Sequence, residues 1–118
     1  MRSLKKQIVI PILNDEYKII VCFGKPEEIK KILRQWGHHP ADTVLDAQNR
    51  RGICYHTKGC HPIIAMPRIP KTPAEIGTLA HEAVHAVGDI FRMIEQDSSE
   101  EVYAHSVGAV VRGVLLKI

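Results

Sequence analysis

The motif His81-Glu82-Ala83-Val84-His85 carries the clearest chemistry in the chain. On a helix, residues four apart lie one turn apart on the same face, so both imidazoles can reach one metal ion. Glu82 lies one residue round the helix, where it can take a proton from a zinc-bound water and pass it to a leaving amine. This H-E-x-x-H spacing predicts a zinc site with His81 and His85 as ligands and Glu82 as general base and acid. The alternative is two histidines packed on an amphipathic helix.

A catalytic zinc takes three protein ligands and keeps one position open. In one extended form of the motif the third ligand lies six residues after the second histidine, but that position is Phe91, which cannot bind a metal. Asp89 lies one turn beyond His85 and suits a supporting or capping role. We therefore look for the third ligand in the last helix of the chain.

Glu101 is the predicted third ligand. Capping of the last helix is the alternative, because Ser98 to Glu101 has the S-x-x-E spacing of a capping box. Glu100 is a rival ligand. Small residues on the same face predict that this helix lies close to the H-E-x-x-H helix; the face comprises Glu101, Ala104, His105, Gly108, Val111 and Arg112.

Hydrolysis also needs a hydrogen-bond donor for the oxyanion of the transition state. Tyr103, His105 and Arg112 are candidates on the last helix. His105 is preferred because it shares the face of Glu101, and the alternative is that it simply packs or supports a neighbour.

Capping signals place these residues on helices. Thr72-Pro73-Ala74-Glu75 is a capping box with proline at the first helical position, which predicts a helix from Pro73 to about Ile94. Asp97-Ser98-Ser99 interrupts the pattern, and a last helix is expected from about Ser99 to Leu116. A short connection predicts that the two helices are antiparallel neighbours.

The first half of the chain predicts strands and one helix. Residues 7–13 and 17–23 form a predicted hairpin around Asn14-Asp15, with one buried face on the second strand. A helix is expected from Pro26 to Gly37, then a loop over residues 37–43. Two short strands follow near 52–57 and 62–67, joined by the turn Lys58-Gly59-Cys60. This order indicates an α+β fold, with a small mixed or antiparallel sheet.

Further cysteines and histidines lie outside the motif. A second cluster comprises Cys54, His56, Cys60 and His61, whose spacing matches no usual zinc site. These residues could form a second metal site; the alternative is that they are ordinary loop residues and a buried thiol. A thiolate from this loop that reaches the zinc is a further alternative. His38-His39 is expected to be an exposed loop pair, and Cys22 a core thiol.

Length and composition bound these interpretations. The chain has 118 residues and a net charge of +3, which predicts a single domain over residues 1–118. The basic residues form no run or stripe, which argues against a nucleic-acid partner. No apolar run is long enough for a membrane span, and residues 8–13 are too short for a signal peptide, so we expect a cytoplasmic protein. Three cysteines without other signs of secretion argue against a disulfide framework.

Residues 62–115 resemble the small phage- and prophage-type zinc metallopeptidases of the gluzincin group. The matching strings are Ile63-Ile64-Ala65-Met66-Pro67, Thr72-Pro73, Ile76 to His85, and Glu101-Val102-Tyr103-Ala104 with Gly108. The resemblance implies a minimal zincin-like fold and one Zn²⁺ held by His81, His85 and Glu101. It also implies that residues 62–67 form an edge strand, where Ile63, Ile64, Ala65 and Met66 bind a peptide as an added strand.

The resulting prediction is a zinc metallopeptidase that acts on a peptide or protein substrate, and the sequence is compatible with an active or a latent enzyme. The chain is short, so a second copy or a partner protein is expected to complete the cleft. One alternative is an inert zincin-fold binding module that acts through a protein partner. The other is a small nucleic-acid-associated protein that binds metal.

Overall fold

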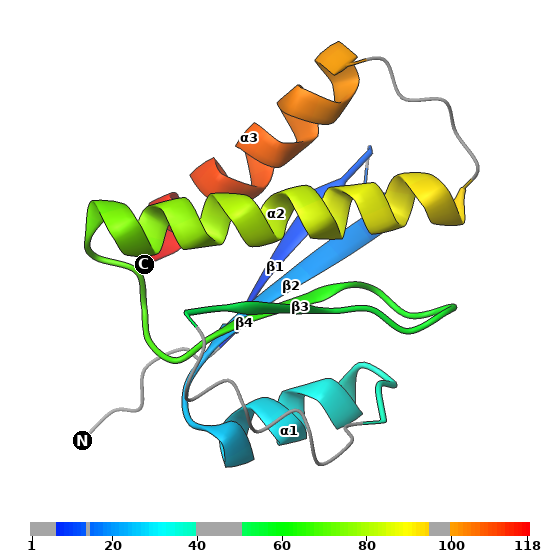
Figure 1. Cartoon of the computed structure of the whole chain (residues 1–118). Coiled ribbons are helices and arrows are strands. Elements are labelled where there is room, and N and C mark those ends of the chain that lie inside the picture. Colours follow the sequence, from blue (N-terminus) through cyan, green and yellow to red (C-terminus); the bar gives the residue numbers. More distant parts are fainter. Residues whose placement is uncertain (1–6, 14, 40–50, 95–99) are drawn as a thin grey trace.

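The computed structural model describes residues 7–13, 15–39, 51–94 and 100–118. These residues form four strands and three helices, with the first helix between the two pairs of strands and the other two helices at the end (Figure 1). They are β1 (Gln7–Ile12), β2 (Tyr17–Phe23), α1 (Pro26–Gln35), β3 (Ile53–Tyr55), β4 (Ile63–Met66), α2 (Pro73–Met93) and α3 (Glu100–Lys117). The predicted α+β class is confirmed, and each predicted helix and strand is present within a few residues of its expected bounds.

The four strands form one mixed sheet in the order β1-β2-β4-β3. β1 and β2 are the predicted antiparallel hairpin, with Ile8 opposite Val21. β2 and β4 are parallel, and β3 and β4 are antiparallel, with Cys54 opposite Ile64. The edges of the sheet are therefore β1 and β3 within the described part of the chain.

The position of β4 corrects the prediction for residues 62–67. We expected an edge strand there, but β4 lies between β2 and β3, and Ile63, Ile64, Ala65 and Met66 are each at most 1% exposed. Pro62 and Pro67 lie just outside the strand, so every residue within it keeps its main-chain N–H for pairing on either side. The two prolines are therefore compatible with a central strand. Because both neighbours use its main chain, β4 cannot take up a further strand, and the edge on this side is β3.

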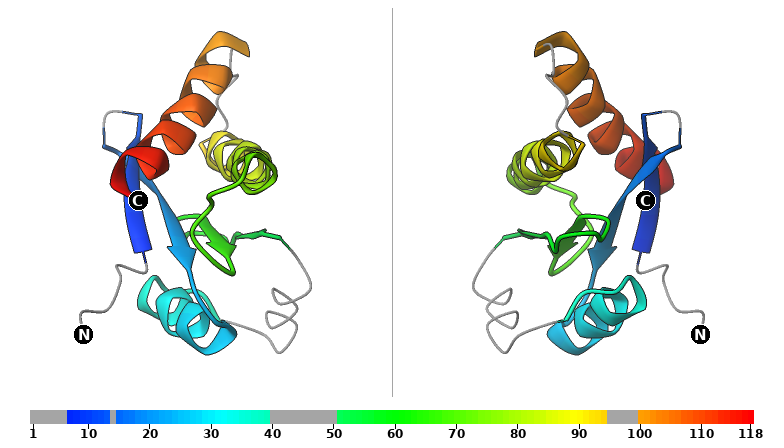
Figure 2. Two further views of the ribbon diagram at one scale, coloured as in Figure 1. Left: turned by 90° about the vertical axis from the view of Figure 1, so that its left-hand side faces the viewer. Right: turned by 90° about the vertical axis from the view of Figure 1, so that its right-hand side faces the viewer.

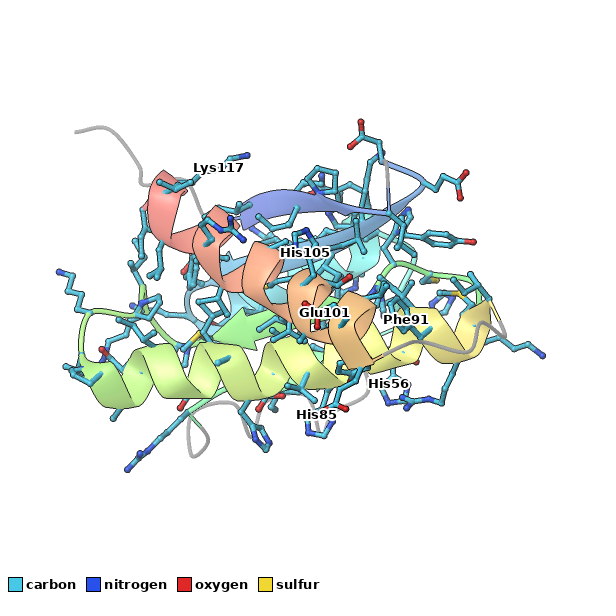
Figure 3. The ribbon with its side chains drawn as sticks, turned by 90° about the horizontal axis from the view of Figure 1, so that it is seen from above. His56, His85, Phe91, Glu101, His105 and Lys117 are labelled. Carbon is cyan, nitrogen blue, oxygen red and sulfur yellow. The ribbon has the colours of Figure 1, made fainter. Side chains whose placement is uncertain are left out.

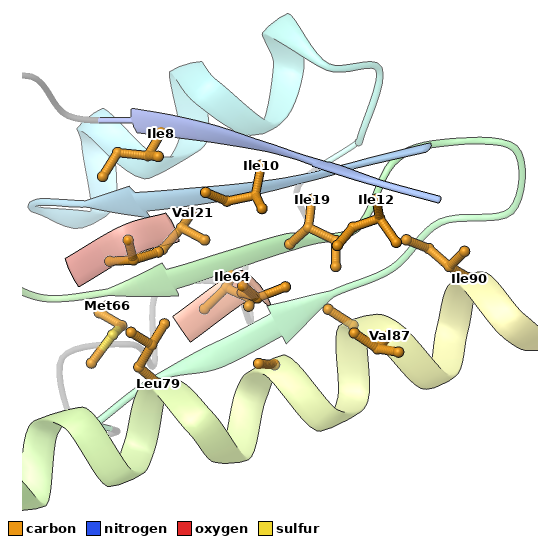
Figure 4. Packing of buried hydrophobic residues seen from close by; sticks show 14 of the residues in the cluster. Ile8, Ile10, Ile12, Ile19, Val21, Ile64, Met66, Leu79, Val87 and Ile90 are labelled. Carbon is orange, nitrogen blue, oxygen red and sulfur yellow. The ribbon is translucent and has the colours of Figure 1, made fainter. Parts of the chain in front are cut away.

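The sheet is covered on both faces, as Figure 2 shows. The larger apolar cluster lies between the sheet and the pair α2 and α3 (Figure 4). The smaller cluster packs Ile29, Ile32 and Leu33 of α1 against Ile20 and Ile63 on the opposite face. The predicted single buried face of β2 is therefore wrong: Ile19 to Phe23 are all buried, because helices pack on both sides.

The end of α1 is joined to the loop between β3 and β4 by a buried histidine. Gly37 has φ +87°, a conformation that favours glycine, and the chain then turns His38 inward. His38 is 3% exposed, its Nε2 lies 2.8 Å from the carbonyl oxygen of His61, and its Nδ1 lies 2.9 Å from the Thr57 hydroxyl. The expectation of an exposed His38 is wrong because both ring nitrogens find partners in the interior, whereas His39 is exposed as expected.

α2 begins with the predicted capping box. The Glu75 N–H donates to the Thr72 hydroxyl over 3.1 Å, and the Glu75 carboxylate accepts from the N–H groups of Lys71 and Thr72. Arg68 donates to the same carboxylate over 2.6 Å, and together these bonds lower the pKa of Glu75 to about 2. The predicted interruption at Asp97-Ser98-Ser99, the S-x-x-E cap from Ser98 and part of the 37–43 loop lie outside the described residues. None of the helices in the described ranges is both long and apolar enough to cross a membrane.

Candidate metal and catalytic site

The two histidines of the motif converge on the outer face of α2. Their Nε2 atoms lie 3.3 Å apart, and the ring centroids lie 4.9 Å apart at an interplanar angle of 77°. Both side chains are exposed, in contrast to the packed histidines of the alternative interpretation. The helix therefore presents two imidazole nitrogens to solvent at one point, as the i, i+4 spacing predicts.

Glu82 lies on the flank of α2 that faces β3. A Cβ added to Gly52, just before β3, would lie 2.9 Å from Cγ2 of Thr78 and 3.4 Å from Cγ of Glu82. Glycine at this position thus allows the start of the edge strand to pass close to the glutamate. Glu82 is half-buried next to Gly52, and it follows the exposed His81 in the chain.

The opposite flank of α2 carries α3. The Tyr103 hydroxyl donates to the carbonyl oxygen of Val84 over 2.6 Å, and the Tyr103 ring packs edge-on against Phe91 with centroids 5.5 Å apart. A Cβ on Gly88 would lie 2.9 Å from the Tyr103 hydroxyl oxygen, so glycine makes room for this contact. Tyr103 therefore ties the start of α3 to the turn of α2 that separates His81 from His85.

The predicted packing face of α3 is wrong. α3 buries Ser106, Val110 and Val114, whereas Ala104 is exposed and a Cβ on Gly108 would meet nothing within 4 Å. The close approach instead uses Gly113, whose added Cβ would lie 2.7 Å from Cδ1 of Ile10 in β1. The apolar residues of α3 determine its orientation, because burying them yields more free energy than the close contact of two small residues.

Glu101 and His105 therefore lie on the exposed face of α3 (Figure 3). Glu100, the rival ligand, is also exposed. Across residues 7–13, 15–39, 51–94 and 100–118, no three His, Cys, Asp or Glu side chains form a group that could hold a metal ion. The structure brings the imidazoles of His81 and His85 together, and within the described ranges neither Glu101 nor another carboxylate or thiol completes a group of three with them.

The second cysteine and histidine cluster is divided between the two faces of the sheet. Cys54 packs in the larger core, where burial raises the pKa of its thiol to about 12 and the carboxylates of Glu82 and Asp89 add to the increase. Cys60 lies on the other side, with its Sγ 3.6 Å from the carbonyl oxygen of Gly37, and His61 packs edge-on against Trp36. The four residues do not come together as one metal site in the described structure.

The sequence suggested His56 only as a member of the second cluster and did not predict its approach to α2. Nδ1 of His56 lies 3.7 Å from Oδ1 of Asp89, which also lies 4.0 Å from Nη2 of Arg92. Two signals could have found it: His56 is two residues after Cys54 and shares its face of the strand, and Asp89 follows His85 by one turn. Asp89 thus faces His56 and Arg92, and the supporting or capping role expected of it stays a prediction.

Other features lie away from the motif. A pocket of about 400 Å³ opens at the end of α1, lined by Arg34, Gly37, His38 and His39. The ring nitrogens of His38 are already bonded there. Cys22 is fully buried, as predicted, and burial raises the pKa of its thiol to about 12.

No protein-family model, curated protein or solved structure matches the chain. The function therefore has to be inferred from the side chains and their geometry.

Proposed function

We propose that the protein is a zinc-dependent peptidase that hydrolyses peptide bonds at the outer face of α2. The distance of 3.3 Å between the Nε2 atoms of His81 and His85 carries the proposal. Two nitrogens bound to one tetrahedral zinc at about 2.0–2.1 Å lie about 3.3–3.4 Å apart, so this pair has the spacing of two ligands of one ion. A hydrogen bond between two imidazoles is the competing explanation, and it predicts no metal uptake.

The donor set suits zinc in kind as well as spacing. Imidazole nitrogen and carboxylate oxygen are both ordinary zinc ligands, and such a site also accepts cobalt or manganese. When bound, zinc lowers the pKa of a water ligand and polarises a carbonyl group. Glu101 remains the proposed third ligand on the basis of the family resemblance. Its side chain is exposed on α3.

Glu82 is the proposed general base and acid. It follows His81 on α2, its side chain is half-buried, and its Cγ lies close to Gly52 just before β3. It takes the proton of the attacking water and returns a proton to the nitrogen of the leaving amine. Proton transfer of this kind contributes about 10²–10⁴-fold to a rate, so Glu82 is the residue whose loss separates catalysis from metal binding.

The edge strand next to the site is the proposed place for the substrate. β3 pairs with β4 on one side, and its other side has no strand partner among the described residues. A peptide added there would run past Gly52 and Glu82, with main-chain hydrogen bonds to β3. This assigns to β3 the role that the sequence had suggested for Ile63 to Met66.

Metal content tests the proposal first. Purified protein, reloaded with zinc and analysed by mass spectrometry, should hold one zinc per chain, and His85→Ala and Glu101→Ala should lose it or bind it much more weakly. Retention in Glu101→Ala alone would remove Glu101 from the ligand set. The absence of zinc from the reloaded wild type would contradict the peptidase proposal and leave the pair as a hydrogen bond.

A further inference from the structure

Alternate residues in and next to β3 face α2, on the side of the proposed site. Successive residues of a strand point to opposite faces, so Gly52, Cys54 and His56 share the face that meets the helix. The contacts follow the helix in the same order: Gly52 lies against Thr78 and Glu82, Cys54 lies within the field of Glu82 and Asp89, and His56 faces Asp89. The edge strand thus carries one imidazole to the level of Asp89.

That level is one helical turn beyond His85. Four residues of an α-helix rise about 6 Å, so Asp89 follows His85 closely on the same side of α2. His56 and His85 lie along the same border of α2 in Figure 3. His56 is 64% exposed in its side chain, whereas the Asp89 side chain is 19% exposed and fixed on the helix. The carboxylate is therefore the rigid partner, and the imidazole is the one that can reach outward.

We infer that His56, oriented by Asp89, donates the hydrogen bond that stabilises the oxyanion of the substrate during hydrolysis. The inference rests on the proposed peptidase function. With a proton on each ring nitrogen, Nδ1 faces the Asp89 carboxylate and Nε2 is left to donate outward. Within the described ranges no protein group bonds Nε2 of His56, so this donor is available to a ligand.

In the proposed hydrolysis His56 donates a hydrogen bond but does not gain or lose a proton. The oxygen of water attacks the carbonyl carbon, a C–O bond forms, the electron pair of the C=O π bond moves to the carbonyl oxygen, and Glu82 takes the proton of the water. His56 donates to the oxygen that has gained the negative charge. The C–N bond then breaks, the C=O bond re-forms, and the proton on Glu82 passes to the leaving nitrogen.

His56 fits this role better than His105, the donor that the sequence suggested. His105 is exposed on the face of α3 that points away from its packed side, and no carboxylate orients it among the described residues. His56 directly follows β3, the strand that we propose for substrate binding, and its partner lies on the helix of the motif. The structure therefore provides a fixed carboxylate, an imidazole and a strand edge in one place.

The test compares His56→Gln with the control His39→Gln, a substitution of an exposed histidine outside the proposed site, in zinc-loaded protein. Inorganic phosphate serves as the anion probe, titrated by NMR, and zinc content is measured in every variant. Both variants should keep one zinc, and His56→Gln should lower the affinity for phosphate about tenfold, because a charge-assisted hydrogen bond is lost. In hydrolysis of casein, His56→Gln should lower kcat about 10²-fold with little change in KM, because the bond strengthens in the transition state. His39→Gln should change neither quantity.

Asp89 acts through His56 as a positioning residue. Asp89→Asn should lower kcat in the same direction with KM and zinc content unchanged, and Asp89→Glu should recover part of the loss. A merely structural role for Asp89 would instead change stability and KM together.

The outcomes separate the two proposals. No zinc in the reloaded wild type would overturn the peptidase function and this inference with it. One zinc with equal phosphate affinity and equal kcat in wild type and His56→Gln would overturn the inference alone. The same holds if zinc-loaded wild type does not bind phosphate.

Discussion

Two pairs of histidines meet in this molecule, and their surroundings are opposite. His38 is buried between α1 and the loop before β4, where it faces the main chain of His61 and the Thr57 hydroxyl. Because a carbonyl oxygen only accepts, Nε2 of His38 donates to His61, while Nδ1 pairs with the Thr57 hydroxyl, which can donate or accept. His81 and His85 are exposed on α2, and their Nε2 atoms face each other.

The difference distinguishes a histidine that holds the fold from one that is available to a ligand. Every ring nitrogen of His38 is used inside the protein, so its removal should cost stability and leave metal binding unchanged. The motif histidines make no contact in the described structure that the core requires. Their removal should cost little stability and abolish metal binding. Four predictions test this contrast, from the largest expected effect to the smallest.

Glu82→Gln should keep one zinc per chain and lower the rate of casein hydrolysis by about 10²–10⁴-fold. The amide keeps the shape of the side chain beside the histidines but cannot accept the proton of the water. Metal content and kcat are measured on the same preparation, with exposed Glu27→Gln of α1 as the control. Unchanged hydrolysis in Glu82→Gln would exclude Glu82 as the base, and hydrolysis in neither wild type nor variant would favour the inert binding module.

His38→Ala should lower the free energy of unfolding by about 3 kcal/mol, because it leaves buried polar partners unpaired and opens a cavity. In contrast, His85→Ala should change it by less than about 0.5 kcal/mol in metal-free protein. Urea unfolding of both variants gives the comparison. Equal losses of stability would break the distinction between the two pairs.

Tyr103→Phe should cost about 1 kcal/mol, the net value of one hydrogen bond, because the Val84 carbonyl loses its donor while the ring stays against Phe91. The matched control is Tyr17→Phe, since the Tyr17 ring packs against the same core and its hydroxyl has no partner in the described ranges. If Tyr103 ties α3 to the motif, hydrogen exchange in the first turns of α3 should rise in Tyr103→Phe only. Equal exchange in the two variants would count against this tie.

His61, the partner of the buried His38, should make the free energy of unfolding of the protein depend on pH. Burial lowers the pKa of His61, and Lys18 and His38 lower it further. The unfolded chain therefore takes up a proton near the ordinary pKa of 6.5 that the folded protein resists, so stability is full above this pH and falls as the pH is lowered through it. The urea midpoint should fall from pH 7 to pH 5, and His61→Gln should show less of this fall than His39→Gln. Identical pH dependence in the two variants would remove His61 as the cause.

Local signals in the sequence predicted most of the elements. The capping box at Thr72 locates the start of α2, because its hydrogen bonds join residues three apart. The alternation of β1 and β2 predicts the hairpin, and the i, i+4 spacing brings His81 and His85 together. Each of these features depends on neighbours within one or two turns of chain, so the residue types alone specify them.

Only the tertiary structure decided which surfaces these elements share. The placement of β4 inside the sheet depends on β3 and β2 pairing with it, and α3 buries Val110 and Val114 because the larger core lies on that side. The burial of His38 and the approach of His56 to Asp89 join residues 23 and 33 positions apart, respectively. Such contacts form where the total burial of apolar surface is greatest, and no short pattern in the sequence encodes that sum. The chain by itself thus determined a helix on which two imidazoles converge, and the packing of distant segments decided which groups surround them.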